Sequence, residues 1–289
     1  MNNPIMNKLT AEEKELYKDL IQDVDNNIDI KSVILSDENK QKLKEFLNEY
    51  SFRDKLLSYG LNPVNRLLFY GASGTGKTYL TKALSNYMKY SMLYVDIAKS
   101  LSEDTVAMNI SNIFKIANKY GKCIIFFDEC DSIAWSRDSK SAEGGMVRRA
   151  TNSLFQQLDQ MNKTNIFVSA TNMLHRLDPA FERRFDMKFE FRRPDKEIRD
   201  VAKKFLFKDF SLNIDVNSDD EQIVKRRSTL SYYELQIITE RNMKKAVMRG
   251  TTVVNLSDIL NDIAIQMHMK TRFGTDKDDE TVMYTSSIV

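Results

Sequence analysis

The eight residues GASGTGKT, at positions 71–78, constrain the fold of this chain more than any other part of its sequence. An apolar run at residues 67–70 leads directly into them, and a stretch with helical character follows at residues 79–90. A glycine-rich turn between a strand and a helix lets backbone N–H groups surround phosphate oxygens, which the positive N-terminal end of the helix also attracts. The pattern therefore predicts a strand–loop–helix unit that binds phosphate.

The residues of this loop have separate expected roles. The glycines Gly71, Gly74 and Gly76 allow the backbone to curl around a phosphate group. Lys77 would reach the β and γ phosphates of a nucleotide, and Thr78 would give its hydroxyl oxygen to Mg²⁺. We therefore expect ATP and Mg²⁺ as cofactors, with the nucleotide held by the whole loop, which consists of Gly71, Ala72, Ser73, Gly74, Thr75, Gly76, Lys77 and Thr78.

Two carboxylates form the expected hydrolytic half of the site. Asp128 and Glu129 directly follow the apolar run at residues 123–127, so both emerge at the C-terminal end of a predicted buried strand. Ligands of open α/β sheets bind at that edge. We expect Asp128 to hold Mg²⁺, directly or through water, and Glu129 to polarise the attacking water.

From residue 66 onward, short apolar runs alternate with helical patterns, which is typical of a parallel sheet built from βαβ units. The runs cover residues 67–70, 92–97, 123–127, 166–170 and 188–191. After Pro194 we expect no further strand, but helices at residues 195–210, 231–249 and 257–269. The sequence therefore predicts an α/β domain followed by a small all-α domain.

The two ends of the chain have their own patterns. Thr10 and Glu13 have the spacing of a capping box, and Leu16, Leu20 and Val24 then recur on one face, so a short amphipathic helix is expected there. The polar, acidic sequence after residue 270 predicts a disordered tail. The expected organisation is an N-terminal helical segment (1–28), an α/β nucleotide-binding domain (29–193), a helical domain (194–270) and a tail (271–289).

With these motifs in this order, residues 29–269 resemble an AAA+ ATPase, and more narrowly the classical AAA branch. The resemblance implies a five-stranded parallel sheet with helices on both faces, which carries the nucleotide site, and a small helical lid. It also implies that the chain hydrolyses ATP. In the segment NIFVSATN, Asn172 matches the family's sensor, which orients the lytic water.

The segment LDPAFERRFD, at residues 177–186, resembles the region that carries arginine fingers in the same branch. Its adjacent pair, Arg183 and Arg184, lacks a Pro-Gly spacer and is most similar to the severing and disassembly subgroup and to short single-module relatives. A finger supplied by a neighbouring chain contributes about 10³–10⁵ in rate. The resemblance therefore implies a homo-oligomer, a hexameric ring, in which an isolated chain hydrolyses ATP poorly.

One loop departs from the family. Substrate-threading members carry an aromatic residue and a glycine after the second strand, where this chain has KSLSEDT at residues 99–105. Either another residue, such as Leu101 or Met108, grips polypeptide in the ring channel, or the protein does not thread polypeptide. Both alternatives stay open at this stage.

The composition bears on partners and location. The 43 basic and 41 acidic residues leave a formal net charge of +2, which gives no electrostatic reason for a nucleic acid or an anionic membrane as partner. No apolar run approaches the roughly 18 residues of a membrane span. The two cysteines, Cys123 and Cys130, fit core positions in a reducing compartment. We expect a cytoplasmic protein.

Three functions are compatible with these features. The first is a ring-shaped ATPase that remodels a protein or a protein complex. The second is an ATPase that serves a DNA transaction such as loading or replication, for which basic residues could cluster in a ring channel. The third is a nucleotide-dependent assembly switch with slow hydrolysis, which the missing channel aromatic favours.

Overall fold

The computed structural model describes residues 9–17, 21–22, 27–95, 106–132, 142–227 and 229–273. The chain divides into two compact units, Met1–Arg192 and Arg193–Val289. No helix in the described part of the chain is long and apolar enough to cross a membrane.

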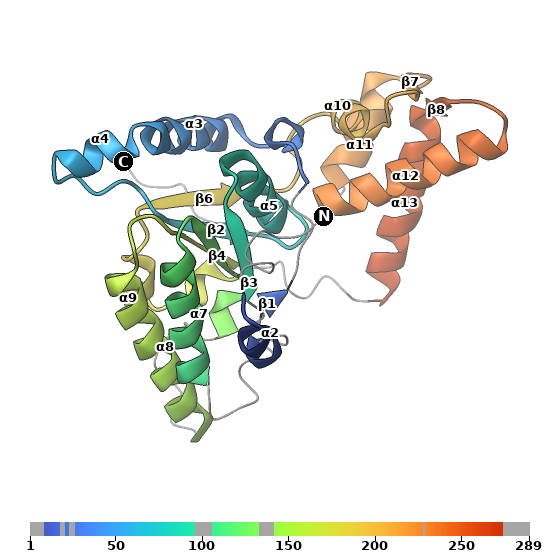
Figure 1. Cartoon of the computed structure of the whole chain (residues 1–289). Helices are drawn as coiled ribbons and strands as arrows, with labels where there is room; N and C mark the ends of the chain where they lie inside the picture. Colours follow the sequence, from blue (N-terminus) through green and yellow to red (C-terminus); the bar gives the residue numbers. More distant parts are fainter. Residues whose placement is uncertain are drawn as a thin grey trace, which may run out of the picture. The chain divides into compact units, whose positions relative to one another are not determined.

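The first unit is built on one sheet with the strand order β1-β3-β4-β5-β2-β6 (Figure 1). Five neighbouring strands run parallel, which confirms the predicted five-stranded parallel sheet. They are β2 (Arg66–Gly71), β3 (Ser91–Val95), β4 (Cys123–Phe127), β5 (Ile166–Thr171) and β6 (Met187–Phe191). The short strand β1 (Ile21–Gln22) adds an antiparallel edge to β3.

Helices cover both faces of this sheet, as expected (Figure 1). On one face lie α7 (Val106–Tyr120), α8 (Ala142–Gln160) and α9 (Pro179–Glu182). On the other lie α3 (Asp37–Ser51) and α5 (Lys77–Met88). Alternation along β4 sends Ile125 and Phe127 to the first face and Ile124 and Phe126 to the second. Because both faces are buried, the strands are continuous apolar runs in the sequence.

The N-terminal segment differs from its prediction. The helix α2 (Ala11–Tyr17) starts at the predicted capping box, in which the Thr10 N–H donates to Glu13 and the Glu13 N–H donates to Thr10. The continuation of this helix to Val24 is wrong, because β1 begins at Ile21 and pairs with β3. Backbone pairing with an open sheet edge overrides the helical spacing of the apolar residues there.

The second unit contains α10 (Ile198–Phe205), α11 (Ser218–Arg227), α12 (Tyr232–Met248) and α13 (Leu256–Phe273). The expectation that no strand follows Pro194 is wrong, since β7 (Ser211–Asn213) pairs in parallel with β8 (Val253–Asn255). Strands of three residues are too short to show an alternating pattern. Since α13 extends to Phe273, the tail predicted from Thr271 starts too early, and the rest of it lies outside the described residues.

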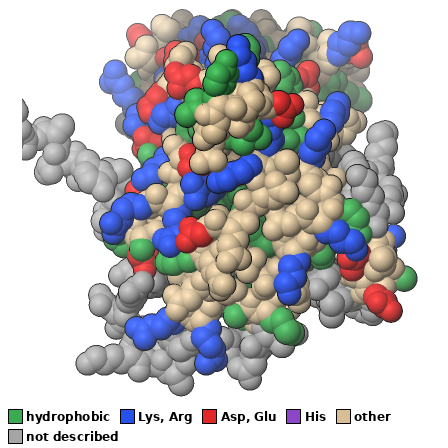
Figure 2. All heavy atoms as spheres, turned by 60° about the vertical axis from the view of Figure 1, so that its left-hand side comes forward, with side chains coloured by type: hydrophobic (Ala, Val, Ile, Leu, Met, Phe, Trp, Pro, Cys, Tyr) green, Lys and Arg blue, Asp and Glu red, His purple; other side chains and the backbone are tan. Residues whose placement is uncertain are grey.

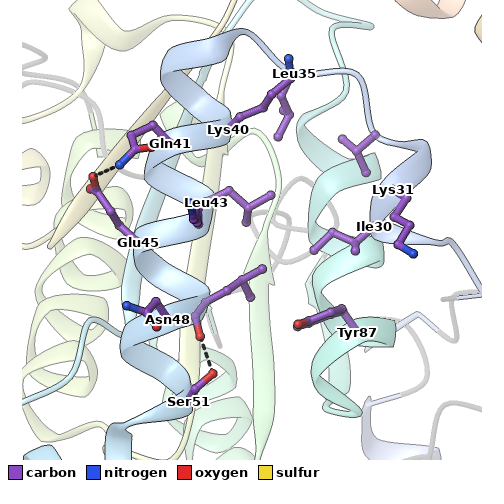
Figure 3. A pocket seen from close by; sticks show the side chains of 13 residues that line it. Ile30, Lys31, Leu35, Lys40, Gln41, Leu43, Glu45, Asn48, Ser51 and Tyr87 are labelled. Carbon is purple, nitrogen blue, oxygen red and sulfur yellow. Dashed lines mark hydrogen bonds between the residues drawn. The ribbon is translucent and has the colours of Figure 1, made fainter.

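A groove of about 750 Å³ runs along α3. Its opposite wall is formed by α5 and the short 3-10 helix η1 (Ile30–Ser32). In Figure 3, Leu43 on α3 points across the groove toward Ile30 and Tyr87. None of the residues that line the groove belongs to positions 71–78, so the groove is separate from the phosphate loop.

Candidate active site

The strand order brings the predicted site segments to one edge of the sheet. Because β5 lies between β4 and β2, the C-terminal ends of these three parallel strands are neighbours. The phosphate loop follows β2, the pair Asp128-Glu129 follows β4, and Asn172 follows β5. Residues that are about a hundred positions apart in the sequence are therefore close in space at the edge where α/β sheets bind ligands.

Backbone geometry explains the glycines of the loop. Gly71 adopts φ 136°, and a Cβ atom there would lie 2.0 Å from the backbone oxygen of Phe191 on the neighbouring β6. Gly74 and Gly76 adopt φ 71° and 105°, in the region that favours glycine. Gly76 is also the N-cap of α5, so the first N–H groups of this helix meet no capping side chain and are available to an anion.

Lys77 lies at the centre of the site and is only 7% exposed. Its Nζ donates to the backbone oxygens of Gly71 and Ala72, at 2.7 and 2.9 Å, and to Oδ1 of Asn172, at 2.7 Å. An ammonium group has three donors, and all three are in use. Phosphate oxygens that entered the loop could replace these acceptors, which would release Asn172 at the same time.

Burial lowers the pKa of Lys77 to about 8, although the nearby carboxylates of Asp128, Asp131 and Glu129 act in the opposite direction. The ammonium form is thus only moderately stable in the free protein near pH 8. Bound phosphates would favour that charged form.

We therefore expect ATP binding to take up a proton above about pH 8. In that range the ATP affinity should fall by up to about tenfold for each pH unit. Below pH 7, Lys77 is already charged. ATP binding should therefore cause no proton uptake by this group, and Lys77 should give the ATP affinity no pH dependence. Calorimetric titrations at pH 7 and pH 9, each in two buffers of different ionisation enthalpy, measure the uptake. Equal affinities and no uptake at pH 9 would contradict the prediction.

Asp128 is oriented by three donors. Its Oδ2 accepts hydrogen bonds from the hydroxyls of Thr78, at 2.9 Å, and Tyr94, at 3.1 Å. Its Oδ1 accepts one from the Glu129 N–H, at 3.0 Å. Since the Thr78 hydroxyl donates a hydrogen bond to the carboxylate, the lone pairs of the hydroxyl oxygen stay available to a cation.

These groups fit a magnesium ion. Mg²⁺ prefers oxygen ligands and is usually held by one or two carboxylates together with substrate phosphates. Thr78 and Asp128 supply such oxygens next to the phosphate loop. The described residues contain no group of three or more histidine, cysteine, aspartate or glutamate side chains that could hold a metal, so they show no self-sufficient metal cage.

Glu129 differs from Asp128 in its surroundings. Its backbone has φ 51°, a left-handed conformation that costs a non-glycine residue about 1–3 kcal/mol and is common at functional sites. The side chain is exposed, and among the described residues no hydrogen bond or ion pair involves its carboxylate. A carboxylate that accepts no hydrogen bond from these residues has its oxygens available for a water molecule.

The motifs do not single out three residues that the structure places at this edge. Tyr94 contacts Asp128, and the Thr171 hydroxyl donates to Asp131 at 2.7 Å, which joins the end of β5 to the turn after β4. The only sequence signal is position: Tyr94 lies within a predicted strand, and Thr171 and Asp131 lie shortly after the ends of two others. Their pairing depends on strand order, which the sequence pattern leaves unspecified.

The two arginines have different environments. The guanidinium of Arg184 lies 4.1 Å from the centre of the Phe155 ring and also binds Asp159 and the backbone oxygen of Ala180. Arg183 is exposed, and only its Nε is engaged, by the backbone oxygen of Pro179. In the described part of the chain, no hydrogen bond or ion pair joins either arginine to the phosphate loop or to residues 128, 129 and 172.

Two comparisons with known proteins bear on this site. Residues 67–193, which contain every site residue predicted above, match the model of the ATPase family associated with various cellular activities (AAA). The chain is also similar to a protein of Sinorhizobium fredii described as "Uncharacterized AAA family ATPase y4kL". The two are 27% identical over 262 residues, which cover 90% of this chain and 77% of the relative.

Proposed function

Because residues 67–193 form an ATPase domain of the AAA family, we propose that this ATP hydrolase acts as a magnesium-dependent hexameric ring and remodels a protein or a protein complex. ATP binding and hydrolysis follow from the family. The ring, the magnesium ion and the protein substrate are the parts that the proposal adds.

The observation that carries the ring is the environment of Arg183. A guanidinium with free terminal nitrogens is suited to a phosphoryl group, and that of Arg183 has no partner for them among the described residues. Asp186, three residues further on, accepts hydrogen bonds from the N–H groups of Asn65 and Arg66 and fixes the turn. An arginine held at the surface and bonded to no residue of its own site is available to the site of a neighbouring subunit.

In the proposed reaction, Lys77 exchanges the loop carbonyls and Asn172 for the β and γ phosphates. Thr78 and Asp128 would hold a magnesium ion, which would supply positive charge to the phosphate oxygens. Glu129 accepts a proton from the attacking water, the bond between the γ phosphorus and the bridging oxygen breaks, and ADP and phosphate leave. Arg183 of the next subunit stabilises charge on the transferred group.

The distribution of charge does not favour a DNA transaction. In the face that Figure 2 shows, basic side chains lie among acidic, hydrophobic and uncharged ones. Together with the net charge of +2, this mixture of charges gives no electrostatic reason for a nucleic acid as partner. Hydrolysis that nucleic acid stimulates strongly and that salt suppresses would instead support the DNA alternative.

A cytoplasmic location is part of the proposal. Cys123 and Cys130 are both buried cysteines outside any disulfide bond of the described residues, and burial raises the pKa of the Cys130 thiol to about 12. Protonated core thiols are usual in a reducing compartment.

The proposal predicts that turnover per subunit rises with protein concentration as rings form. Sedimentation velocity with ATP should show the assembly over the same concentration range, and without nucleotide the assembly should be weaker. Constant turnover by a species that sediments as a monomer would contradict the ring.

The proposed protein substrate has its own test. A protein captured with the Glu129→Gln variant should stimulate hydrolysis by the parent enzyme, whereas an unrelated protein should not.

A further inference from the structure

The hydroxyl of Tyr94, near the end of β3, lies 3.1 Å from Oδ2 of Asp128. We propose that Tyr94 is a positioning residue that fixes the Asp128 carboxylate for magnesium. This inference rests on the proposed magnesium-dependent function and assigns it a further residue, which none of the sequence motifs contains.

The sheet itself brings Tyr94 to Asp128. In the parallel pairing of β3 with β4, Tyr94 is the partner of Phe126. Side chains two positions apart on a strand point to the same face, so Asp128, just after the end of β4, continues the face of Phe126. This is the face that carries α5, whose second residue is Thr78. The Asp128 carboxylate, just after β4, therefore meets the hydroxyl of Tyr94 from β3 and that of Thr78 from α5.

The ring of Tyr94 is held independently of its hydroxyl. It packs edge-on against the Phe126 ring, with 5.4 Å between the ring centres and 62° between the planes. It also contacts the buried cluster beneath α3 and α5. An anchored ring fixes the position of the phenol oxygen, because the hydroxyl has no torsion other than the rotation of its own proton.

The hydrogen bond determines which part of the carboxylate faces the loop. A carboxylate has about four lone-pair sites, and the three donors on Asp128 are Thr78, Tyr94 and the Glu129 N–H. Without the Tyr94 hydroxyl, Thr78 would be the only donor to Oδ2, and the carboxylate would be freer to rotate. Groups that orient a metal ligand typically change metal affinity about 10–100-fold when they are removed.

The test uses Tyr94→Phe, which removes the hydroxyl and keeps the ring. The Tyr94→Phe protein and the reference protein with Tyr94 intact both also carry Glu129→Gln, so that ATP is not consumed. The measured quantity is the gain in ATP affinity that magnesium provides, taken as the ratio of the dissociation constants in EDTA and in saturating Mg²⁺. We expect Tyr94→Phe to reduce this gain about tenfold or more, while the ATP affinity in EDTA is unchanged.

Two further variants calibrate the result. Tyr120→Phe removes a phenol hydroxyl that binds Glu13, far from the loop in the sequence, and should keep the full gain. Asp128→Asn should lose it. If Tyr94→Phe keeps the gain that Asp128→Asn loses, the role of Tyr94 is disproved and the proposed function stands. If magnesium gives no gain even with Asp128 intact, the proposed magnesium dependence fails and the inference fails with it. A Tyr94→Phe protein that does not fold would show a structural role and overturn the inference.

Discussion

Exchanging Glu129 for glutamine should lower ATP turnover about 10²–10⁴-fold, the contribution typical of a general base, and leave ATP affinity unchanged. The amide has nearly the shape of the carboxylate, but it cannot accept the proton of the attacking water. The Glu129 side chain is exposed and has no hydrogen-bond partner among the described residues, so its replacement should not disturb the fold. Calorimetry gives the affinity, and phosphate release under saturating ATP gives the turnover.

The matched variant for binding is Lys77→Ala. Lys77 supplies the only side-chain cation of the phosphate loop, so its loss should abolish measurable ATP binding while thermal unfolding still reports a folded protein. Opposite outcomes for the two variants separate binding from chemistry. If Glu129→Gln hydrolysed ATP at the parental rate, another base would be needed, and the neighbouring Asp131 is already engaged by Thr171.

The parallel sheet could be predicted from sequence because its strands are buried on both faces. Such strands are unbroken apolar runs, and the run at residues 123–127 coincides with β4. The capping box at Thr10 is equally visible in the sequence, since a cap depends on residues only three positions apart. Features that are encoded locally are the ones that the pattern predicts.

The features that the pattern does not predict depend on contacts between distant segments. The strand β1 forms because β3 offers an open edge, and β7 and β8 are too short to show a period. The contact between Tyr94 and Asp128 requires β3 and β4 to be neighbours in a defined register. The assigned roles of the loop, of Asp128 and of Asn172 stay predictions until variants are measured.

The structure also separates two arginines that the sequence treats alike. Arg184 is anchored by the Phe155 ring and by Asp159, so Arg184→Ala should lower the temperature of unfolding. Arg183 has one bond to a backbone oxygen and an otherwise exposed side chain, so Arg183→Ala should leave that temperature unchanged. If both substitutions lowered the temperature of unfolding equally, the different environments of the two arginines would not affect the stability of the protein.

Arg183→Ala should nevertheless lower turnover per assembled subunit about 10³-fold or more, the effect of losing an arginine finger. Because the proposed finger acts on a neighbouring site, a subunit with Arg183→Ala keeps Glu129 and lacks only the arginine that its neighbour supplies. A Glu129→Gln subunit has the opposite defect: it supplies Arg183 but cannot activate water. Each variant alone should be inactive, and a mixture should regain hydrolysis, since some interfaces combine an intact Glu129 with an intact Arg183.

The mixture is decisive when sedimentation shows that the two variants assemble together. Recovered hydrolysis that disappears on dilution below the assembly range would establish that Arg183 acts between subunits.

A co-assembled mixture without activity leaves two explanations. Either Arg183 serves its own subunit, or one inactive site arrests the whole ring. Mixing each variant with parent protein separates them: arrest predicts that a few variant subunits abolish most of the parental turnover, whereas action within the subunit predicts a loss in proportion to the variant fraction. The second result would remove the main support for the ring, because an arginine that serves its own site gives no reason for a neighbour.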